Sequence, residues 1–133
     1  MPLITTFMLI VGMFTASSHE SYANRGVDVL DTSGDYVDRI SQGHQVILSS
    51  QIRGTVNEPR SFVAIFEIRD ANGSTILLAW QSGIMSPDSI TDIGVSWIPE
   101  SSGNYQVRQF VLSNMTSPTV LQEVKTTNLL VYE

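Results

Sequence analysis

The chain has 133 residues, a formal net charge of −6 at pH 7 and no cysteine. Its length is that of one domain, which buries enough surface to fold without a metal or a disulfide. The missing cysteines exclude disulfides, thiolate metal sites and nucleophilic thiols, and the scattered Lys and Arg residues argue against binding driven by nucleic-acid phosphates or an anionic membrane.

The chain begins with an uncharged apolar run, followed by small and polar residues that end at Ala23. This order is typical of a secretory signal peptide with a small-x-small cleavage site, so we predict a signal peptide over residues 1–23 and one mature domain over residues 24–133. A retained anchor is the next alternative, although a run of about 14 apolar residues is short of the ~20 that span a bilayer. A buried helix of a cytosolic protein is the third. We expect the mature domain to be secreted or at the cell surface.

The mature chain consists of short segments rich in Val, Ile, Phe, Thr and Leu, separated by Gly, Pro, Asn, Asp and Ser. Apolar residues alternate with a period of two and not of 3.6, which predicts strands. The expected strands are residues 27–30 continued by 37–40, then 44–56, 62–69, 75–81, 93–97, 104–112 and 121–132. About seven antiparallel strands with frequent turns predict an all-β, immunoglobulin-like sandwich.

Alternation also assigns the faces of several strands. The side chains expected to face the core are Val46, Leu48, Ser50 and Ile52 in one strand, Phe62, Ala64, Phe66 and Ile68 in the next, and Ile93, Val95 and Trp97 in a later one. Residues 75–81 are apolar on both sides, so the inner side of that strand stays open. Trp97 is favoured as a core residue over an aromatic binding platform, and so is Trp80, although its face is not assigned.

Few residues are suited to catalysis or metal binding. A Ser-His-Asp triad or a multi-histidine site would depend on His44 alone, because His19 lies in the leader. We expect His44 to be an exposed strand-end residue. Four aspartates fall within residues 28–38, but their spacing differs from a calcium-binding EF-hand, so an ordinary Asp/Ser/Gly turn is favoured. We predict no enzyme, no cofactor and no resident metal.

Two triplets fit the glycosylation sequon, at Asn72 and at Asn114. The first is also a turn signal, because Asn72-Gly73 tolerates the positive φ angles of a type I′ hairpin. We therefore expect the strand over residues 75–81 to pair with the strand before it, and we treat both asparagines as candidates for glycosylation.

Two stretches, VDVLDTSGDYVDRISQGHQVILSSQI and WIPESSGNYQVRQFVL, resemble the immunoglobulin-like modules of prokaryotic, especially archaeal, exported and cell-surface proteins. The resemblance covers nearly the whole mature chain. Within it, the segment from Gly103 to Val107 is similar to the tyrosine corner of immunoglobulin domains, which implies that the Tyr105 ring packs inward and that its hydroxyl bonds a backbone group near the turn. A bulge near Arg108 and Gln109 would then turn Phe110 and Leu112 inward.

Such modules serve as adhesive, spacer and assembly units, so we expect a non-enzymatic exported domain that contacts a protein partner or itself at the cell envelope. We expect no nucleic-acid partner, and contact with a membrane only through an uncleaved N-terminal segment. The expected contact face is Val63, Ile65, Leu77 and Trp80. The alternative is a ligand-binding or inhibitor module that binds carbohydrate, calcium or a protease through the loops at residues 57–59, 82–88 and 113–118.

Overall fold

The computed structural model describes residues 27–54 and 57–133, so the predicted signal peptide and His19 lie outside the described residues. The described ranges form eight β-strands and no helix: β1 (Asp28–Leu30), β2 (Arg39–Ser41), β3 (Val46–Arg53), β4 (Arg60–Arg69), β5 (Thr75–Met85), β6 (Ile90–Trp97), β7 (Gly103–Leu112) and β8 (Val120–Tyr132). A helix long and apolar enough to cross a bilayer is accordingly not found in these ranges.

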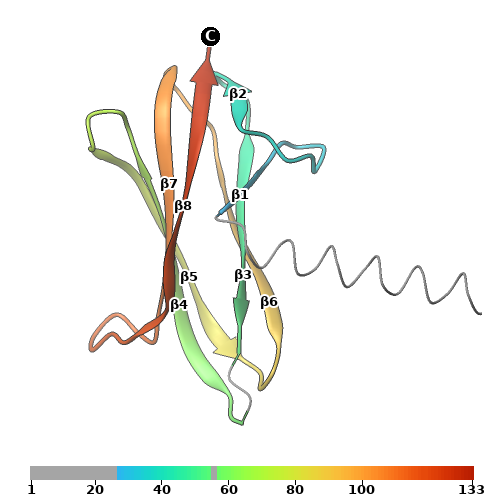
Figure 1. Cartoon of the computed structure of the whole chain (residues 1–133), viewed down its shortest axis with the longest axis vertical. Helices are drawn as coiled ribbons and strands as arrows, with labels where there is room; N and C mark the ends of the chain where they lie inside the picture. The colour runs from blue at the N-terminus through green and yellow to red at the C-terminus, as the bar shows by residue number, and fades with distance from the viewer. Residues whose placement is uncertain (1–26, 55–56) are drawn as a thin grey trace, which may run out of the picture.

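The strands form two sheets that pack face to face (Figure 1). One sheet has three strands in the order β1-β3-β6, and the other has five in the order β2-β8-β7-β4-β5. The short pairing of β2 with β8 is parallel, and the other pairings are antiparallel. This arrangement confirms the predicted immunoglobulin-like sandwich.

The core lies between the two sheets and is built from alternate side chains of each strand. The predicted inner residues of β3 and β4 are all buried: Val46, Leu48, Ser50, Ile52, Phe62, Ala64, Phe66 and Ile68. In β6, Ile93 is buried and Trp97 packs against the core cluster. Because successive side chains of a strand point to opposite faces, the apolar alternation in the sequence was sufficient to place these residues.

Strand β7 differs from the expected arrangement. It pairs with β4 without a register shift, and its buried residues are Tyr105, Val107, Gln109 and Val111. Phe110 and Leu112 therefore face outward and are half-buried, so the predicted inward turn of these two residues is wrong. The register shifts lie in the pairing with β8, which carries the extra residues.

A polar cluster inside the sandwich accounts for the inward position of Gln109. Its Oε1 accepts a hydrogen bond of 3.1 Å from the Ser50 hydroxyl. The half-buried Lys125 ammonium donates to Ser50 Oγ at 3.3 Å and to the Gln51 carbonyl at 3.2 Å. The Gln109 Nε2 group is buried without a hydrogen-bond partner. The free-energy cost of burying these polar groups is reduced because most of them form hydrogen bonds with one another.

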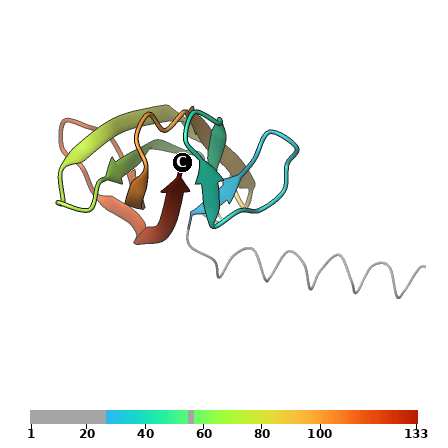
Figure 2. The ribbon, with the colours of Figure 1, turned by 90° about the horizontal axis from the view of Figure 1, so that it is seen from above.

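Two projecting turns have the same design and lie on opposite sides of the molecule (Figures 1 and 2). In the turn after β1, the Asp31 carboxylate accepts from the amides of Ser33 and Asp35 at 2.9 and 3.0 Å. In the turn between β4 and β5, the Asp70 carboxylate accepts from the amides two and four residues later, both at 2.9 Å. The favoured Asp/Ser/Gly turn is thus confirmed.

The hairpin between β4 and β5 is confirmed, but its turn type is not. A type I′ turn needs positive φ at both central residues. Gly73 has a φ of 82°, whereas the only described non-glycine residue with a positive φ is Asp88, so Asn72 does not adopt that conformation. The Asp70 carboxylate, which accepts from the amides of Asn72 and Ser74, stabilises this turn in place of the expected type I′ geometry.

Strand β5 runs to Met85, four residues beyond its expected end at Gln81. The sequence predicted a loop over residues 82–88. Gly83 instead pairs with Phe62, and a Cβ at this position would approach the Phe62 ring to 3.2 Å. The glycine therefore makes room for an aromatic neighbour on the adjacent strand.

The segment after β6 forms the tyrosine corner that the resemblance implied. The Tyr105 hydroxyl donates a 2.7 Å hydrogen bond to the Ser101 carbonyl, and the ring is 8% exposed. Its centroid lies 5.1 Å from that of Trp97 in an edge-to-face contact. The turn before β3 docks on the same segment, since the Gly43 amide donates to the Pro99 carbonyl at 2.8 Å. The segment from Trp97 to Tyr105 is therefore a structural corner.

Candidate contact surface on the five-stranded sheet

The outer face of the five-stranded sheet carries side chains of β8, β7, β4 and β5 in cross-strand rows. The pairing places Asn128, Gln106, Arg69 and Thr75 in one row, Thr126, Arg108, Glu67 and Leu78 in the next, Phe110, Ile65 and Trp80 in the third, and Val120, Leu112, Val63 and Ser82 in the fourth. The first two rows are mainly polar and the last two mainly apolar.

The apolar rows, with Ile84 beside them, form what we call the outer apolar patch: Val63, Ile65, Trp80, Ile84, Phe110, Leu112 and Val120. Three of its side chains are strongly exposed, with Trp80 at 60%, Val120 at 67% and Ile84 at 75%. Contiguous exposed apolar side chains on a soluble domain indicate an interaction surface.

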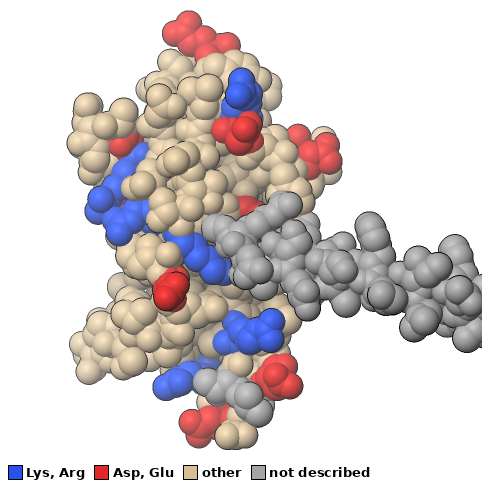
Figure 3. All heavy atoms as spheres, in the orientation of Figure 1, with Lys and Arg blue, Asp and Glu red and all other residues tan. Residues whose placement is uncertain are grey.

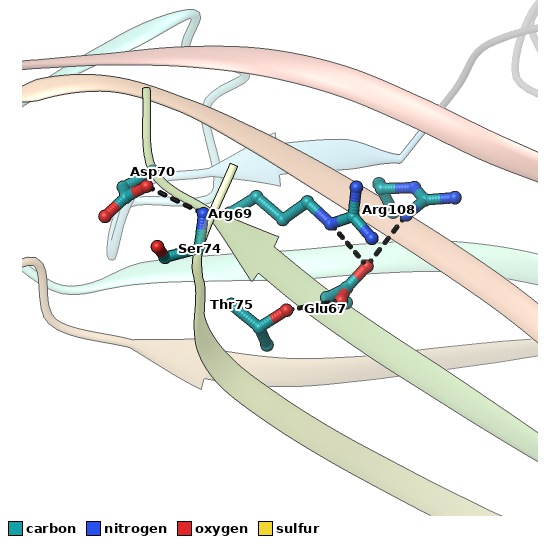
Figure 4. A network of polar contacts seen from close by, with 6 residues as sticks. All are labelled: Glu67, Arg69, Asp70, Ser74, Thr75 and Arg108. Carbon is teal, nitrogen blue, oxygen red and sulfur yellow. Dashed lines mark hydrogen bonds and ion pairs between the residues drawn. The ribbon is translucent and has the colours of Figure 1, made fainter. Parts of the chain in front are cut away.

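The polar rows contain an ion cluster centred on Glu67 (Figure 4). Glu67 Oε1 accepts from Arg108 Nη1 at 3.1 Å and lies 3.2 Å from Arg69 Nε, without hydrogen-bond geometry to the latter. Glu67 Oε2 accepts from the Thr75 hydroxyl at 2.6 Å. The carboxylate is only 12% exposed, so these groups replace most of its water.

The Thr75 hydrogen bond is the largest cause that lowers the pKa of Glu67. Burial opposes it by favouring the neutral acid, while the charges of Arg69 and Arg108 lower the pKa further. The cluster therefore keeps Glu67 ionised, and the carboxylate in turn holds both guanidinium groups in place.

Arg108 joins the two halves of the face. Its guanidinium carbon lies 4.9 Å from the centroid of the Phe110 ring while Nη1 bonds Glu67. A cation over an aromatic face is attracted by the ring's electron density. Because tryptophan and arginine are the residues most often found as hot spots of protein interfaces, Trp80 and Arg108 are the strongest anchors that this face offers.

The structure brings together part of the expected contact face. Ile65 and Trp80 are cross-strand neighbours on the outer side, and Val63 lies in the next row but is only 6% exposed. Leu77 pairs with Ile68 and packs against the core, so it does not belong to this face. The expectation of Trp80 in the core is wrong, and the open assignment of β5 is resolved with Trp80 and Leu78 outward.

Sequence reasoning missed the part of the patch that β7 supplies. The outward position of Phe110 and Leu112, and the contact of Arg108 with the Phe110 ring, were not predicted because the two apolar residues were assigned inward. The available signal was the strict alternation from Tyr105 to Val111, which requires an amide at position 109 to be accepted as a core residue. A polar residue in an apolar series is easily mistaken for a bulge.

The two sequon asparagines have different surroundings. Asn72 lies in an exposed turn, where its backbone amide donates to Asp70. The Asn114 side chain is engaged instead, because its Oδ1 accepts from the amides of Thr116 and Ser117 at 3.0 and 2.7 Å. His44 is exposed at the turn before β3, as expected. Glycosylation remains a prediction, and Asn72 is its better candidate.

The three loops of the alternative function lie at one end of the sandwich. The Gly54 amide donates to the Ser89 carbonyl at 2.8 Å, and the Ser61 hydroxyl of β4 donates to the Ser113 carbonyl at 3.3 Å, so residues that border the three loops lie close together. Residues 82–85 of the expected second loop belong to β5. A shallow hollow lies at the opposite end, lined by Trp97, Ile98, Glu100, Ser101, Tyr105 and others.

Charge is spread over the molecule. Acidic and basic side chains are scattered across the face seen in Figure 3 and form no large area of one sign. Among residues 27–54 and 57–133, no three His, Asp or Glu side chains gather closely enough to hold a metal ion.

No family model and no curated protein sequence matches the chain. Solved structures do resemble it. The C-terminal domain of wzt is 13% identical with a TM-score of 0.67, over 84% of this chain and 77% of that one. A CARDB domain from Pyrococcus furiosus, in complex with di-metal ions, is 16% identical with a TM-score of 0.55, over 80% and 90%.

A β-glucuronidase of Bacteroides uniformis is 11% identical with a TM-score of 0.55, over 77% of this chain and 12% of the enzyme. Proteins with such different names share this architecture, and at identities this low the similarity shows only a common fold. The comparisons thus agree with the strand order in one conclusion, that the chain is an immunoglobulin-like β-sandwich.

Proposed function

We propose that the chain is an exported, non-enzymatic immunoglobulin-like domain that acts by protein contact at the cell surface or in an extracellular assembly. The observation that carries this proposal is the outer apolar patch. Trp80, Ile84 and Val120 expose most of their apolar surface, beside an arginine already fixed by Glu67 and stacked on Phe110.

The arrangement fits the anatomy of a protein interface. A half-buried apolar centre, formed by Ile65, Phe110 and Leu112, is bordered by the polar rows around Glu67. Interfaces commonly combine an apolar core with a polar rim. Because the Glu67 carboxylate fixes Arg108 before any partner binds, less side-chain freedom is lost on association.

The test is capture from the native envelope fraction with tagged protein. We expect wild type to retain a stoichiometric partner, or a second copy of itself, and the double variant Trp80→Ala/Val120→Ser to lose it. The matched control is Ile98→Ser/Met115→Ser, which alters two side chains that are 53% and 60% exposed outside the outer apolar patch. Equal loss in both variants, or a monomer without a partner in wild type, contradicts the proposal.

The loop-based alternative is supported by the convergence of the β3–β4, β5–β6 and β7–β8 loops at one end of the sandwich. Loops held by a rigid scaffold often carry recognition. A thermal-shift screen with glycans, calcium and proteases tests it. A saturable shift that Met115→Ser in the last loop weakens, and that Trp80→Ala leaves intact, would favour this function over the contact surface.

A further inference from the structure

Strand β5 is an open sheet edge. It pairs with β4 on one side, and no other described strand lies on its second side. An unpaired edge presents a row of backbone N–H and C=O groups that can bond another strand. At 11 residues, β5 is also long for an edge strand, and its sequence TILLAWQSGIM contains no charge and no proline. Its protection against pairing is limited to one irregularity near its start, where β5 carries an extra residue, Ile76, opposite Ile68 and Arg69.

The other edges of the two sheets are short, covered or charged. Strands β1 and β2 have three residues each. Strand β6 is covered at its middle by a side chain, because Gln81 Nε2 donates to the Gly94 carbonyl at 2.8 Å and Gln81 Oε1 accepts from the Gly94 amide at 3.3 Å. Strand β8 pairs with β2 only over Leu130–Tyr132, but the rest of that edge carries Glu123 and Lys125, and charged residues oppose strand addition. Of the described edges, β5 alone combines length with an uncharged sequence.

We propose that β5 pairs with β5 of a second copy of this chain, antiparallel and about a two-fold axis near Trp80, to join two five-stranded sheets into one of ten strands. The proposal rests on the contact function proposed above and names its partner. An axis at Trp80 lies at the midpoint of Thr75–Met85, so the two copies of the strand overlap over their full length, with the irregularity at Ile76 near the ends of the pairing. Such a pairing forms about ten backbone hydrogen bonds, as many as a typical protein interface.

The side chains of β5 favour a second copy as the occupant. The strand is uncharged, so self-pairing brings no like charges together, and a foreign strand finds no complementary charge that would select it. The axis is perpendicular to the sheet, which keeps both outer faces on the same side. Trp80 then lies beside its symmetry mate and Leu78 opposite Ser82, so side chains that are 60% and 55% exposed in one copy gain cover from the other.

The absence of native cysteine makes single-cysteine cross-linking a direct test. Cα atoms of directly opposed residues lie about 4.5–5.5 Å apart, within the range that a disulfide spans. In the proposed register, Trp80→Cys cross-links to itself. Leu78→Cys and Ser82→Cys lie roughly 13 Å from their own mates and do not, but an equimolar mixture of the two variants forms a mixed disulfide.

The experiment uses the full chain, one variant carrying a size tag, with mild oxidation and non-reducing gels. Val120→Cys is the matched control, because Val120 is equally exposed on the same face but lies on β8. We expect Trp80→Cys and the 78/82 mixture to cross-link at least about tenfold faster than the control. The mixture leaves Trp80 intact, so it decides the register even if Trp80→Cys folds poorly.

Sedimentation velocity supplies the reversible counterpart. Wild type is expected to be a dimer that Leu78→Lys dissociates and Val120→Lys does not, because a charge on an edge strand opposes strand addition. A monomeric wild type with no cross-linking above the control overturns the inference, and so does a dimer in which Val120→Cys cross-links as fast as Trp80→Cys, which indicates face-to-face packing. If capture from the envelope still depends on the outer apolar patch in either case, the proposed contact function stands without this partner.

Discussion

Tyr105 shows how one hydroxyl secures a corner of the sandwich. The ring packs edge-to-face on Trp97, and the hydroxyl holds the Ser101 carbonyl of the preceding turn. Tyr105→Phe keeps the ring and removes the bond, so we expect a loss of about 1 kcal/mol in the free energy of unfolding. Urea denaturation measures it. Capture of the partner by folded protein should be unchanged, and reduced capture with unchanged stability would make the corner a binding site.

Glu67 makes stability depend on acid pH. Its pKa is lower in the folded chain than the usual value of 4.5, chiefly through the Thr75 hydroxyl. The carboxylate thus stabilises the fold fully above the unfolded-state pKa, and this contribution is lost as pH falls through the lower, folded value. We expect Glu67→Gln to lower the free energy of unfolding at pH 7 and to approach wild type under acid conditions.

The control for Glu67 is Thr75→Val, which removes the donor and keeps the charge. Without that hydrogen bond the pKa of Glu67 in the folded chain should rise toward its usual range. The pH window between the unfolded-state and folded-state pKa then narrows, so the loss of stability in acid should be smaller than in wild type and should end at a higher pH. If the free energies of unfolding of wild type and Glu67→Gln differed by the same amount at every pH, the assigned role of the cluster would be contradicted.

At the scale of elements, the sequence predicted strands whose two faces differ in polarity. Strands β3 and β4 were placed residue by residue, because burying one face imposes period two. Strand β5 resisted assignment, since Leu77 faces the core while Leu78 and Trp80 line an exposed face that is equally apolar. Strand β7 was misjudged because Gln109 occupies a core position that only its hydrogen bond to Ser50 explains. The sequence thus predicted three of the seven side chains of the outer apolar patch.

Strand β8 brings the chain's only lysine into this polar cluster. Burial lowers the pKa of Lys125 below its usual 10.5, and the charge of Asp28 opposes the shift. Between the lowered pKa and 10.5 the unfolded chain binds more protons, so stability rises with pH over that window. We expect Lys125→Met to lose this rise, as measured by denaturation at alkaline pH.

Isotope labelling of Lys125 by reductive methylation gives its titration directly by NMR, because the α-amino group is the chain's only other amine of this kind. A pKa at or above the usual lysine value would contradict the predicted burial effect. Ser50→Ala is a useful companion variant: it removes one acceptor of the ammonium and should lower the pKa further, since the charged form then loses a hydrogen bond.

As a whole, the molecule is a sandwich held by one apolar core and by side chains that hold its turns. The C-terminal domain of wzt and part of a β-glucuronidase have a similar architecture. The architecture alone therefore does not specify where the protein is located or what it contacts, so export and the contact role stay predictions. What distinguishes this chain from a generic sandwich is where its apolar residues remain exposed, on the outer face and along the β5 edge. Self-association and partner binding are therefore properties to measure on the same surface.

Independence from metal ions is a prediction that concerns the whole molecule. Here the acidic side chains of the two projecting turns already bond backbone amides through Asp31 and Asp70. We expect calcium or EDTA to shift the melting temperature by less than about 1 °C, since a ligand stabilises only the state that it binds. Asp31→Ala should lower the melting temperature equally in calcium and in EDTA, because it removes turn hydrogen bonds and not a ligand. A calcium-dependent rise of several degrees that Asp31→Ala abolishes would instead identify the first turn as a metal site.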